Sequence, residues 1–333
     1  MSLKNLVFLL ALPLSFFFDS RSWAEDINLY LKASPRLELL HPYSDPATLT
    51  LLVTGADGKP VPQGRVAIGI EAPKPAWFFS TDFPLVEGSR LLEMSLPLRQ
   101  GRAEWKYLFP IRGEYRLTVE FTARDGGKTK KTFPMEIREN KQKWFLLGIF
   151  SLALFALGVM AGRIFTSRSS RAAQVTAGWV LLLGSLIVSI ETGAAQEAER
   201  GGRFGWLEID PAAAGKPGKV RWRLAGEANT GNQPVLLTLT IAHLEQRKTV
   251  FAIERLPVER EFAMDFQFAD GAEYRVAAIA YVTGGQTLRT EQNITVTGME
   301  PPARAMIPAI GFFLGMIALG LAVGRWSRHA APS

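Results

Sequence analysis

The sequence predicts a mainly β protein that also carries transmembrane α-helices: two immunoglobulin-like β-sandwiches and three transmembrane helices. Three observations lead to this fold class. Long uncharged apolar runs interrupt the chain, segments of alternating polarity fill the stretches between them, and similar motifs recur in the two halves. The chain has 333 residues, of which 47% are hydrophobic, and no cysteine. Disulfides and thiolate metal sites are therefore excluded.

Residues 1–24 are predicted to form a cleaved signal peptide. A basic start at Lys4 precedes an apolar core from Leu6 to Phe18, and Ser22-Trp23-Ala24 supplies small residues where a signal peptidase cleaves. The core is shorter than the roughly 20 residues that a spanning helix needs. An uncleaved anchor helix is the alternative.

Residues 25–140 are predicted to form the first sandwich. The segment Glu114 to Thr122 alternates strictly between polar and apolar residues, as a half-buried antiparallel strand does. Several short strands separated by Gly-containing turns, without helical periodicity, favour an immunoglobulin-like sandwich. The other predicted strands are Thr48–Thr54, Arg65–Glu71, Arg90–Leu98, Ala103–Phe109 and Lys131–Ile137.

Three uncharged segments are long enough to cross a bilayer as helices: residues 144–162, 172–190 and 305–324. The loop 163–171 between the first two contains three arginines and no acid, and the tail 325–333 is also basic. Positive charge marks the cytoplasmic side of a membrane protein. We therefore expect the loop and the tail to be cytoplasmic and both β-domains to be exported.

Residues 203–298 are predicted to form the second sandwich. Phe262, Met264, Phe266 and Phe268 alternate with polar or small residues, which again indicates a strand with one buried face. The other predicted strands are Lys219–Leu224, Pro234–His243, Thr249–Glu254, Tyr274–Val282 and Gln286–Val296.

The two halves share motifs in the same order, which predicts an internal repeat. Glu114-Tyr115-Arg116 recurs as Glu273-Tyr274-Arg275, and the helix end Gly162-Arg163 recurs as Gly324-Arg325. On this interpretation the segment 172–190 corresponds to the signal peptide. Cleavage after it, which would yield two single-anchor fragments, is the alternative to an uncleaved helix.

The distribution of charge argues against nucleic-acid binding. The net charge is +7, but residues 25–140 hold 16 basic and 15 acidic residues, and residues 191–300 hold 12 basic and 15 acidic ones. The basic excess therefore lies beside the apolar runs. That is the pattern of membrane orientation, not of a phosphate-binding surface.

No catalytic, cofactor-binding or metal-binding constellation is predicted. The three histidines, His41, His243 and His329, share no motif, and a lone histidine lacks the partners that a metal or a general base requires. The acidic residues are scattered over strand faces and turns. We therefore expect a protein that is not an enzyme, and an enzyme built from acids of separate strands is the alternative.

The predicted membrane helices carry no ionisable residue, which argues against transport by this chain alone. They do carry glycines four residues apart, a spacing that lets helix backbones approach closely. The residues predicted to pack helices are Gly158, Gly162, Gly311, Gly315, Gly320 and Gly324.

One part of the first half resembles a known group of domains. The run Leu49 to Ile70, with Gly58-Lys59-Pro60-Val61-Pro62 between two strands, and the later Gly113-Glu114-Tyr115-Arg116-Leu117 resemble the YtkA-like or FixH-like periplasmic β-sandwich domains. This resemblance, fainter in the second half, implies a membrane-anchored sandwich tied to copper handling and oxidase assembly.

The chain departs from the metal-binding members of that group. Their histidines and methionines are nearly absent here, and Met94, Met135 and Met264 are distant from any histidine in sequence. We therefore expect no metal and no cofactor in this chain.

The expected protein is a multi-pass protein of a bacterial inner membrane, with both β-domains in the periplasm. We expect it to be an accessory or assembly subunit whose partners are other integral membrane subunits and the lipid bilayer. The alternative is a periplasmic copper- or metal-handling protein for respiratory oxidase assembly.

Overall fold

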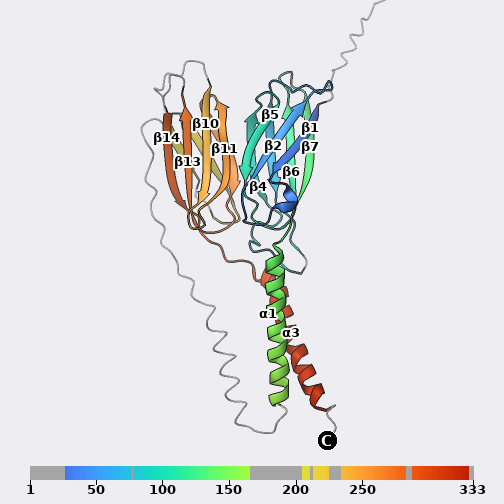
Figure 1. Ribbon diagram of the computed structural model, residues 1–333. Coiled ribbons are helices and arrows are strands. Elements are labelled where there is room, and N and C mark those ends of the chain that lie inside the picture. The colour runs from blue at the N-terminus through green and yellow to red at the C-terminus, as the bar shows by residue number, and fades with distance from the viewer. Residues whose placement is uncertain are drawn as a thin grey trace, which may run out of the picture.

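The computed structural model describes residues 27–76, 78–165, 205–210, 213–224, 234–282 and 287–329. Within these residues the chain forms a β-sandwich of two antiparallel sheets, and two long helices leave one end of it (Figure 1). We call this end of the sandwich the helix-proximal end. The predicted signal peptide (1–24) and the predicted helix over 172–190 lie outside the described residues.

The first half forms seven strands where the alternation predicts most of them. Tyr115, Leu117, Val119 and Phe121 are fully buried, and their neighbours along the strand are more exposed. The first strand, β1, has no counterpart among the predicted strands, because it is an edge strand in which only Leu29 is buried. The elements are β1 (Asn28–Ser34), η1 (Leu37–Leu39), β2 (Ala47–Thr54), β3 (Arg65–Glu71), β4 (Arg90–Pro97), β5 (Arg102–Tyr107), β6 (Gly113–Thr122) and β7 (Lys128–Ile137).

The second half forms a further seven strands. Phe262, Met264 and Phe266 point into the core, as their alternation predicts. The short edge strand β8 is again absent from the predicted set. The elements are β8 (Gly205–Ile209), β9 (Pro217–Leu224), β10 (Val235–His243), β11 (Lys248–Val258), β12 (Glu261–Gln267), β13 (Glu273–Tyr281) and β14 (Thr287–Thr295).

The sequence led us to expect two separate sandwiches. The structure corrects this, because each of the two sheets contains strands of both halves. One sheet has the strand order β1-β2-β5-β11-β10-β13-β14 and the other β7-β6-β3-β4-β12-β9-β8. The seam between the halves consists of two short antiparallel ladders. Phe251 lies opposite Tyr107 in the β5–β11 ladder, and Met264 lies opposite Met94 in the β4–β12 ladder.

The halves have the same strand order and meet in a symmetric way. The set β1-β2-β5 corresponds to β8-β9-β12, and the set β7-β6-β3-β4 corresponds to β14-β13-β10-β11. Exchanging the halves therefore converts the β5–β11 pair into the β12–β4 pair. This is the pattern of an isologous contact between two like units.

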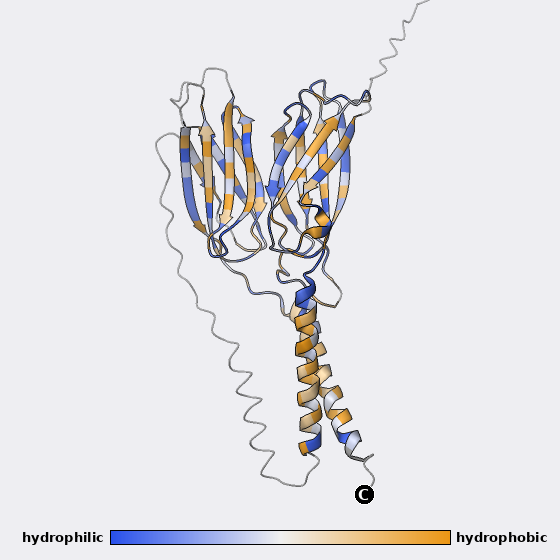
Figure 2. Cartoon of the chain, viewed as in Figure 1, coloured by the Kyte–Doolittle hydropathy of each residue, from blue (hydrophilic) through white to orange (hydrophobic). Residues whose placement is uncertain are grey.

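Helix α1 (Lys141–Phe165) follows β7, and helix α3 (Ala303–His329) follows β14. They contain the predicted spans 144–162 and 305–324. Both helices are long and apolar enough to cross a membrane, with a mean hydropathy of 2.3. Along the face that Figure 2 shows, both helices are apolar over most of their length, whereas the strands alternate. Helices that are apolar all round require either a protein core or lipid around them, and the described residues cover only a small part of these two.

Candidate functional site at the helix-proximal end

The two helices contact each other through glycines. A Cβ atom on Gly158 would lie 3.1 Å from the Cα of Gly320, and one on Gly320 would lie 3.0 Å from the Cα of Gly158. Gly162 lies in the same way against Leu321 and Gly324. The structure therefore brings together four of the six glycines that the sequence predicted to pack helices, at a separation that only glycine permits.

The other two predicted glycines do not take part in this contact. No atom of the described residues lies within 4 Å of a Cβ atom added to Gly311 or Gly315. An α-helix turns about 100° per residue, so Gly311 lies about 180° around α3 from Gly320. Helix α3 therefore carries glycine pairs on two faces, one against α1 and one open.

A long loop between β3 and β4, residues 72–89, sets the first half apart from the second. The corresponding connection between β10 and β11 consists of residues 244–247 only. The extra residues of the long loop change the spacing between equivalent residues of the two halves. Ile70 and Ile241 occupy equivalent positions 171 residues apart, whereas Leu92 and Phe251 are 159 residues apart.

The long loop contacts both helices. The ring centroids of Phe78 and Phe79 lie 6.2 Å and 5.5 Å from that of Phe312 in α3, in edge-on geometry. On the α1 side, the Asp82 carboxylate forms an ion pair with Lys143. The loop thus joins the sandwich to the first turns of α1 and to the side of α3.

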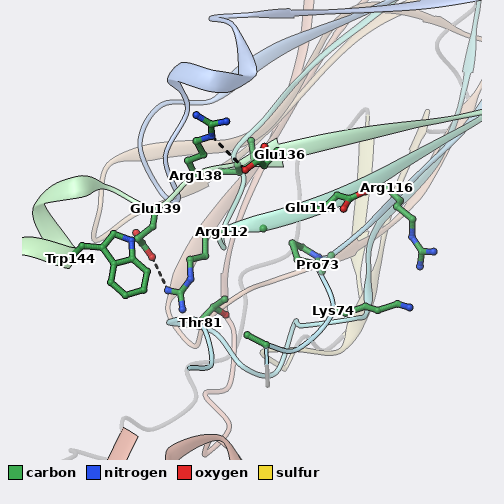
Figure 3. Close-up of a pocket in the computed structure, with 14 residues that line it drawn as sticks. Pro73, Lys74, Thr81, Arg112, Glu114, Arg116, Glu136, Arg138, Glu139 and Trp144 are labelled. Carbon is green, nitrogen blue, oxygen red and sulfur yellow. Dashed lines mark hydrogen bonds and ion pairs between the residues drawn. The ribbon is translucent and has the colours of Figure 1, made fainter. Parts of the chain in front are cut away.

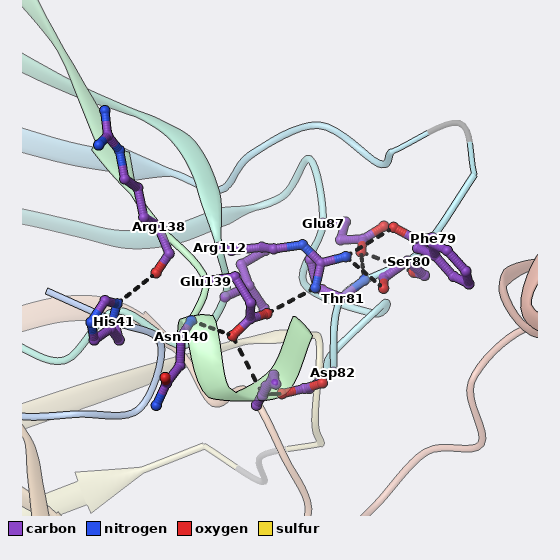
Figure 4. Close-up of polar contacts among 12 residues, drawn as sticks. His41, Phe79, Ser80, Thr81, Asp82, Glu87, Arg112, Arg138, Glu139 and Asn140 are labelled. Carbon is purple, nitrogen blue, oxygen red and sulfur yellow. Dashed lines mark hydrogen bonds and ion pairs between the residues drawn. The ribbon is translucent and has the colours of Figure 1, made fainter. Parts of the chain in front are cut away.

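Arg112 and Glu139 form the centre of the polar contacts under this loop (Figure 4). The guanidinium Nη1 of Arg112 donates to Glu139 Oε2 at 2.9 Å, and its Nη2 donates to the carbonyls of Phe79 and Ser80 at 3.3 Å. The same guanidinium lies 5.6 Å from the ring centroid of Trp144 in α1. Because the Glu139 side chain is only 7% exposed, the pair is one of the better shielded ion pairs of the described residues.

A cavity of about 810 Å³ opens beside this ion pair (Figure 3). Its size is typical of small-molecule pockets, which span about 300 to 1,000 Å³. It is lined by the start of the long loop, by the ends of β6 and β7 and by the first turn of α1. The charged side chains among its lining are Lys74, Arg112, Glu114, Arg116, Glu136, Arg138 and Glu139.

A buried polar cluster around Asp270 joins the two halves. Tyr43 of the first half donates to Asp270 Oδ1 at 3.1 Å, and the Tyr274 hydroxyl donates to the same oxygen. The backbone N–H of Gln246 donates to His243 Nδ1 at 3.3 Å, so Nε2 carries the proton and donates to Asp270 Oδ2 at 3.2 Å. His243 is 1% exposed and fully engaged. Its geometry is that of a structural residue.

The tyrosines of the two halves differ in their partners. In the first half the Tyr115 hydroxyl donates to the carbonyl of Ile111 at 2.6 Å and accepts from its N–H at 2.9 Å. Burial raises the pKa of Tyr115 well above its ordinary value. Burial raises the pKa of Tyr43 and Tyr274 as well, and the nearby Asp270 carboxylate contributes to both increases. All three side chains are therefore neutral phenols in the fold.

The other histidines and the methionines considered in the sequence analysis do not form a common site. His41 bonds through Nδ1 to the carbonyl of Arg138 at 3.0 Å, and the side chain of His329 lies outside the described part of the chain. Met94 and Met264 face each other across the seam ladder and are buried, as is Met135 elsewhere in the core. The described residues contain no group of three or more His, Cys, Asp or Glu that could hold a metal ion.

Sequence reasoning missed the long loop and the pocket beside it. The unequal spacing of the two repeats between their third and fourth strands was a usable signal, because an insertion in one repeat marks a local specialisation. The ion pair itself had no signal. Arg112 and Glu139 are 27 residues apart, and only the register of β6 and β7 brings them together.

Comparisons with known proteins do not assign the chain to a family: no family model and no curated protein matches it. Among solved structures, the native conformation of E. coli alpha-2-macroglobulin is 11% identical with a TM-score of 0.24, covering 81% of this chain and 14% of that one. The Yersinia pseudotuberculosis adhesin InvE is 10% identical with a TM-score of 0.23, covering 83% and 61%. The BSP domain of a biofilm associated protein is 10% identical with a TM-score of 0.19, covering 83% and 30%. The chain spans less than two thirds of each of these neighbours. Likenesses this distant carry no argument about its function.

Proposed function

We propose that this chain is a non-enzymatic accessory or assembly subunit of a bacterial inner-membrane complex. It presents a duplicated, immunoglobulin-like β-sandwich in the periplasm and binds its partner subunit partly within the bilayer. The two long apolar helices support the membrane placement. The open glycine face of α3, Gly311 and Gly315, is the observation that carries the partner binding.

The proposed orientation rests on the charges at the two ends of the helices. The ends remote from the sandwich carry Arg163 and Arg325, and the loop 163–171 has three arginines without an acid. At the sandwich end, Lys143 is paired with Asp82 and Glu139. Its charge is therefore neutralised locally. Lys141 and Arg304 also lie at the sandwich end, but the acids Glu139 and Glu300 accompany them in sequence, whereas the arginines of 163–171 and 325–333 have no acid beside them.

The immunoglobulin-like assignment is supported by the Tyr115 contact. A tyrosine at the start of a strand whose hydroxyl bonds to the backbone a few residues upstream is a hallmark of these sandwiches. Tyr115 does this with Ile111. Tyr274 occupies the equivalent position and bonds to Asp270, also four residues upstream.

Partner binding is proposed at the open glycine face because lipid offers no hydrophobic drive for helices to associate. Association in a bilayer depends on close packing, and glycines four apart provide it. The α1 contact uses Gly320 and Gly324 in this way. Gly311 and Gly315 repeat the same spacing on the opposite face, where no described residue lies within 4 Å of an added Cβ.

The test is co-purification of the full chain from its own membranes in mild detergent. We expect the double variant Gly311→Ile, Gly315→Ile to lose the partner subunits that accompany the wild-type chain. The matched control is Gly148→Ile in α1, a helical glycine that also has open space beside it but no glycine partner four residues away.

Two outcomes would contradict the proposal. One is a wild-type chain that runs as a free monomer at every expression level. The other is a double variant that keeps its partners but unfolds at a lower temperature. That result would indicate that this chain's own segment 172–190 covers the glycine face.

A further inference from the structure

Some charged side chains that line the pocket at the helix-proximal end have no ion-pair partner among the described residues. Arg112 pairs with Glu139, Arg138 with Glu136 at 3.5 Å, and Arg116 with Glu71 at 2.8 Å. After these pairs are assigned, one cation and one anion of the lining remain. They are Lys74 of the long loop and Glu114 of β6, neither of which has an ion-pair partner among the described residues.

The surroundings of these two groups make them suited to an external ligand. Glu114 lies directly opposite Glu136 in the β6–β7 ladder, where like charges are destabilising, and Arg138 neutralises only one of these two carboxylates. The hydroxyl oxygen of Thr81, which also lines the pocket, is buried without a hydrogen-bond partner among the described residues. The pocket therefore offers one unpaired carboxylate for a cation, and an ammonium and a hydroxyl for an anion.

The position of the pocket indicates where such a ligand comes from. Its lining includes Trp144, the first residue of the uncharged run of α1, and tryptophan is enriched at membrane interfaces. The long loop touches α3 at Phe312, about 13 Å beyond the helix start at Ala303 at 1.5 Å per residue. If α1 and α3 cross the bilayer, the pocket opens in the headgroup layer.

We propose that this pocket binds the headgroup of a phospholipid that carries a primary ammonium. Lys74 and the Thr81 hydroxyl contact its phosphate, and Glu114, supported by Glu136, accepts hydrogen bonds from its ammonium. A quaternary ammonium headgroup is disfavoured because it cannot donate hydrogen bonds and needs an aromatic cage. The one aromatic ring of the described lining, Trp144, is already occupied by Arg112.

This inference rests on the membrane placement proposed above but not on the partner subunit. The experiment is native mass spectrometry of the full-length protein in mild detergent, after equilibration with equal amounts of phosphatidylethanolamine, phosphatidylcholine and phosphatidylglycerol. We expect retained phosphatidylethanolamine to exceed each of the other two. In Glu114→Gln its preference over phosphatidylglycerol should fall by about tenfold, corresponding to roughly 1.4 kcal/mol, and Lys74→Gln should lower retention of all three lipids.

The matched control is Glu273→Gln. Glu273 occupies the position of Glu114 in the second half, where the strand connection is short and Thr295 takes the place of Glu136. This control should retain lipid as the wild type does, and none of the variants should lower the Tm, because Lys74 and both glutamates are exposed.

Three outcomes would overturn the proposal. Equal retention of the three lipids by the wild type would show that no headgroup is selected. An unchanged preference in Glu114→Gln would place the selectivity elsewhere. Displacement of the lipid by equimolar water-soluble glycerophosphoethanolamine would show that the ligand is a soluble zwitterion. The co-purification of partner subunits, tested with the Gly311 and Gly315 variants, is independent of all three.

Discussion

The two halves share one strand order but differ where they meet the helices. In the first half, the ion pair of Arg112 and Glu139 joins the ends of β6 and β7 under the long loop. The equivalent positions in the second half are Gly271 and Gly298, whose backbones touch so closely that a side chain on Gly271 would collide with Gly298. The repeat therefore preserved the sandwich and diversified its helix-proximal end.

This difference changes how each half is attached to its helix. The first half passes from Glu139 almost directly into α1, and Asp82 of the long loop holds Lys143 in the first turn of that helix. The second half reaches α3 through residues 299–302, which include two prolines. The position of the sandwich over the helices is thus determined mainly by the first half.

The equivalent tyrosines of the two halves also differ in what they bind. Tyr115 satisfies its hydroxyl within its own loop, through Ile111. Tyr274 instead shares Asp270 with Tyr43 of the other half. The same position thus makes a local contact in the first half and a contact between the halves in the second.

Breaking the contact between the helices should have a strong effect. Arg163 Nε lies 3.4 Å from Ser327 Oγ, so these two side chains face each other across the contact. In the otherwise cysteine-free chain, a bifunctional maleimide should therefore join cysteines placed at Arg163 and Ser327, and mass spectrometry of the crosslinked peptides measures this. Adding Gly320→Ile should abolish the crosslink, because a side chain there collides with the backbone of Phe155 and Gly158. Adding Gly311→Ile instead should leave the crosslink intact, and equal loss in both would contradict the assigned face.

The next effect in size tests the seam. Asp270→Ala should lower the free energy of unfolding by about 3 kcal/mol, because two tyrosine hydroxyls and His243 Nε2 lose their acceptor in a largely buried site. Tyr115→Phe should cost about 1 kcal/mol, since it removes one hydroxyl from a local contact. Urea denaturation of the full chain in detergent measures both. Equal losses would mean that Asp270 does not couple the halves.

Removing the ion pair under the long loop should lower the free energy of unfolding by a smaller amount. Arg112→Ala leaves the shielded Glu139 carboxylate with Lys143, 3.6 Å away, as its remaining cation, so we expect a loss of about 2 kcal/mol. The comparison in the second half is Arg275→Ala. Arg275 pairs with Glu291 on an exposed face, so its substitution should lower the free energy of unfolding by less than about 1 kcal/mol. A reversed order would contradict the view that the first half carries the attachment.

The smallest effect concerns high pH. Burial raises the pKa of Tyr43 and Tyr274 above the ordinary value of 10.0, so the fold favours their neutral forms. Their contribution to stability is complete below pH 10 and is lost as the pH rises above it towards the raised values. In Tyr274→Phe the alkaline loss should be shallower by about 1.4 kcal/mol per pH unit. Unfolding midpoints between pH 8 and 11 test this, and an unchanged slope would contradict it.

Much of the sandwich could be predicted from the sequence because alternation reports burial directly. Strands such as Glu114 to Thr122 bury one face and were predicted to within a residue. The edge strands β1 and β8 were not predicted, because an edge strand such as Asn28–Ser34 buries few side chains and shows little alternation in its sequence. The two described apolar helices, α1 and α3, form where the uncharged length of the sequence predicted helices.

The joining of the halves could not be predicted in the same way. The pairings of β5 with β11 and of β4 with β12 rest on backbone edges, and no side-chain pattern records which edge a strand meets. The pocket could not be predicted for a related reason. Lys74 and Glu114 are ordinary exposed charges in sequence, and only the fold shows that neither is paired within the described residues while both line one cavity.

The most direct test of the account is the side of the membrane on which each end of the molecule lies. Single cysteines in the cysteine-free chain, at Lys59 in a turn at the end of the sandwich remote from the helices and at Ser327 near the end of α3, report this by labelling with an impermeant maleimide. With only the outer membrane permeabilised, we expect position 59 to be labelled and position 327 to be protected until the inner membrane is opened. Labelling of position 327 in intact inner membranes would contradict it.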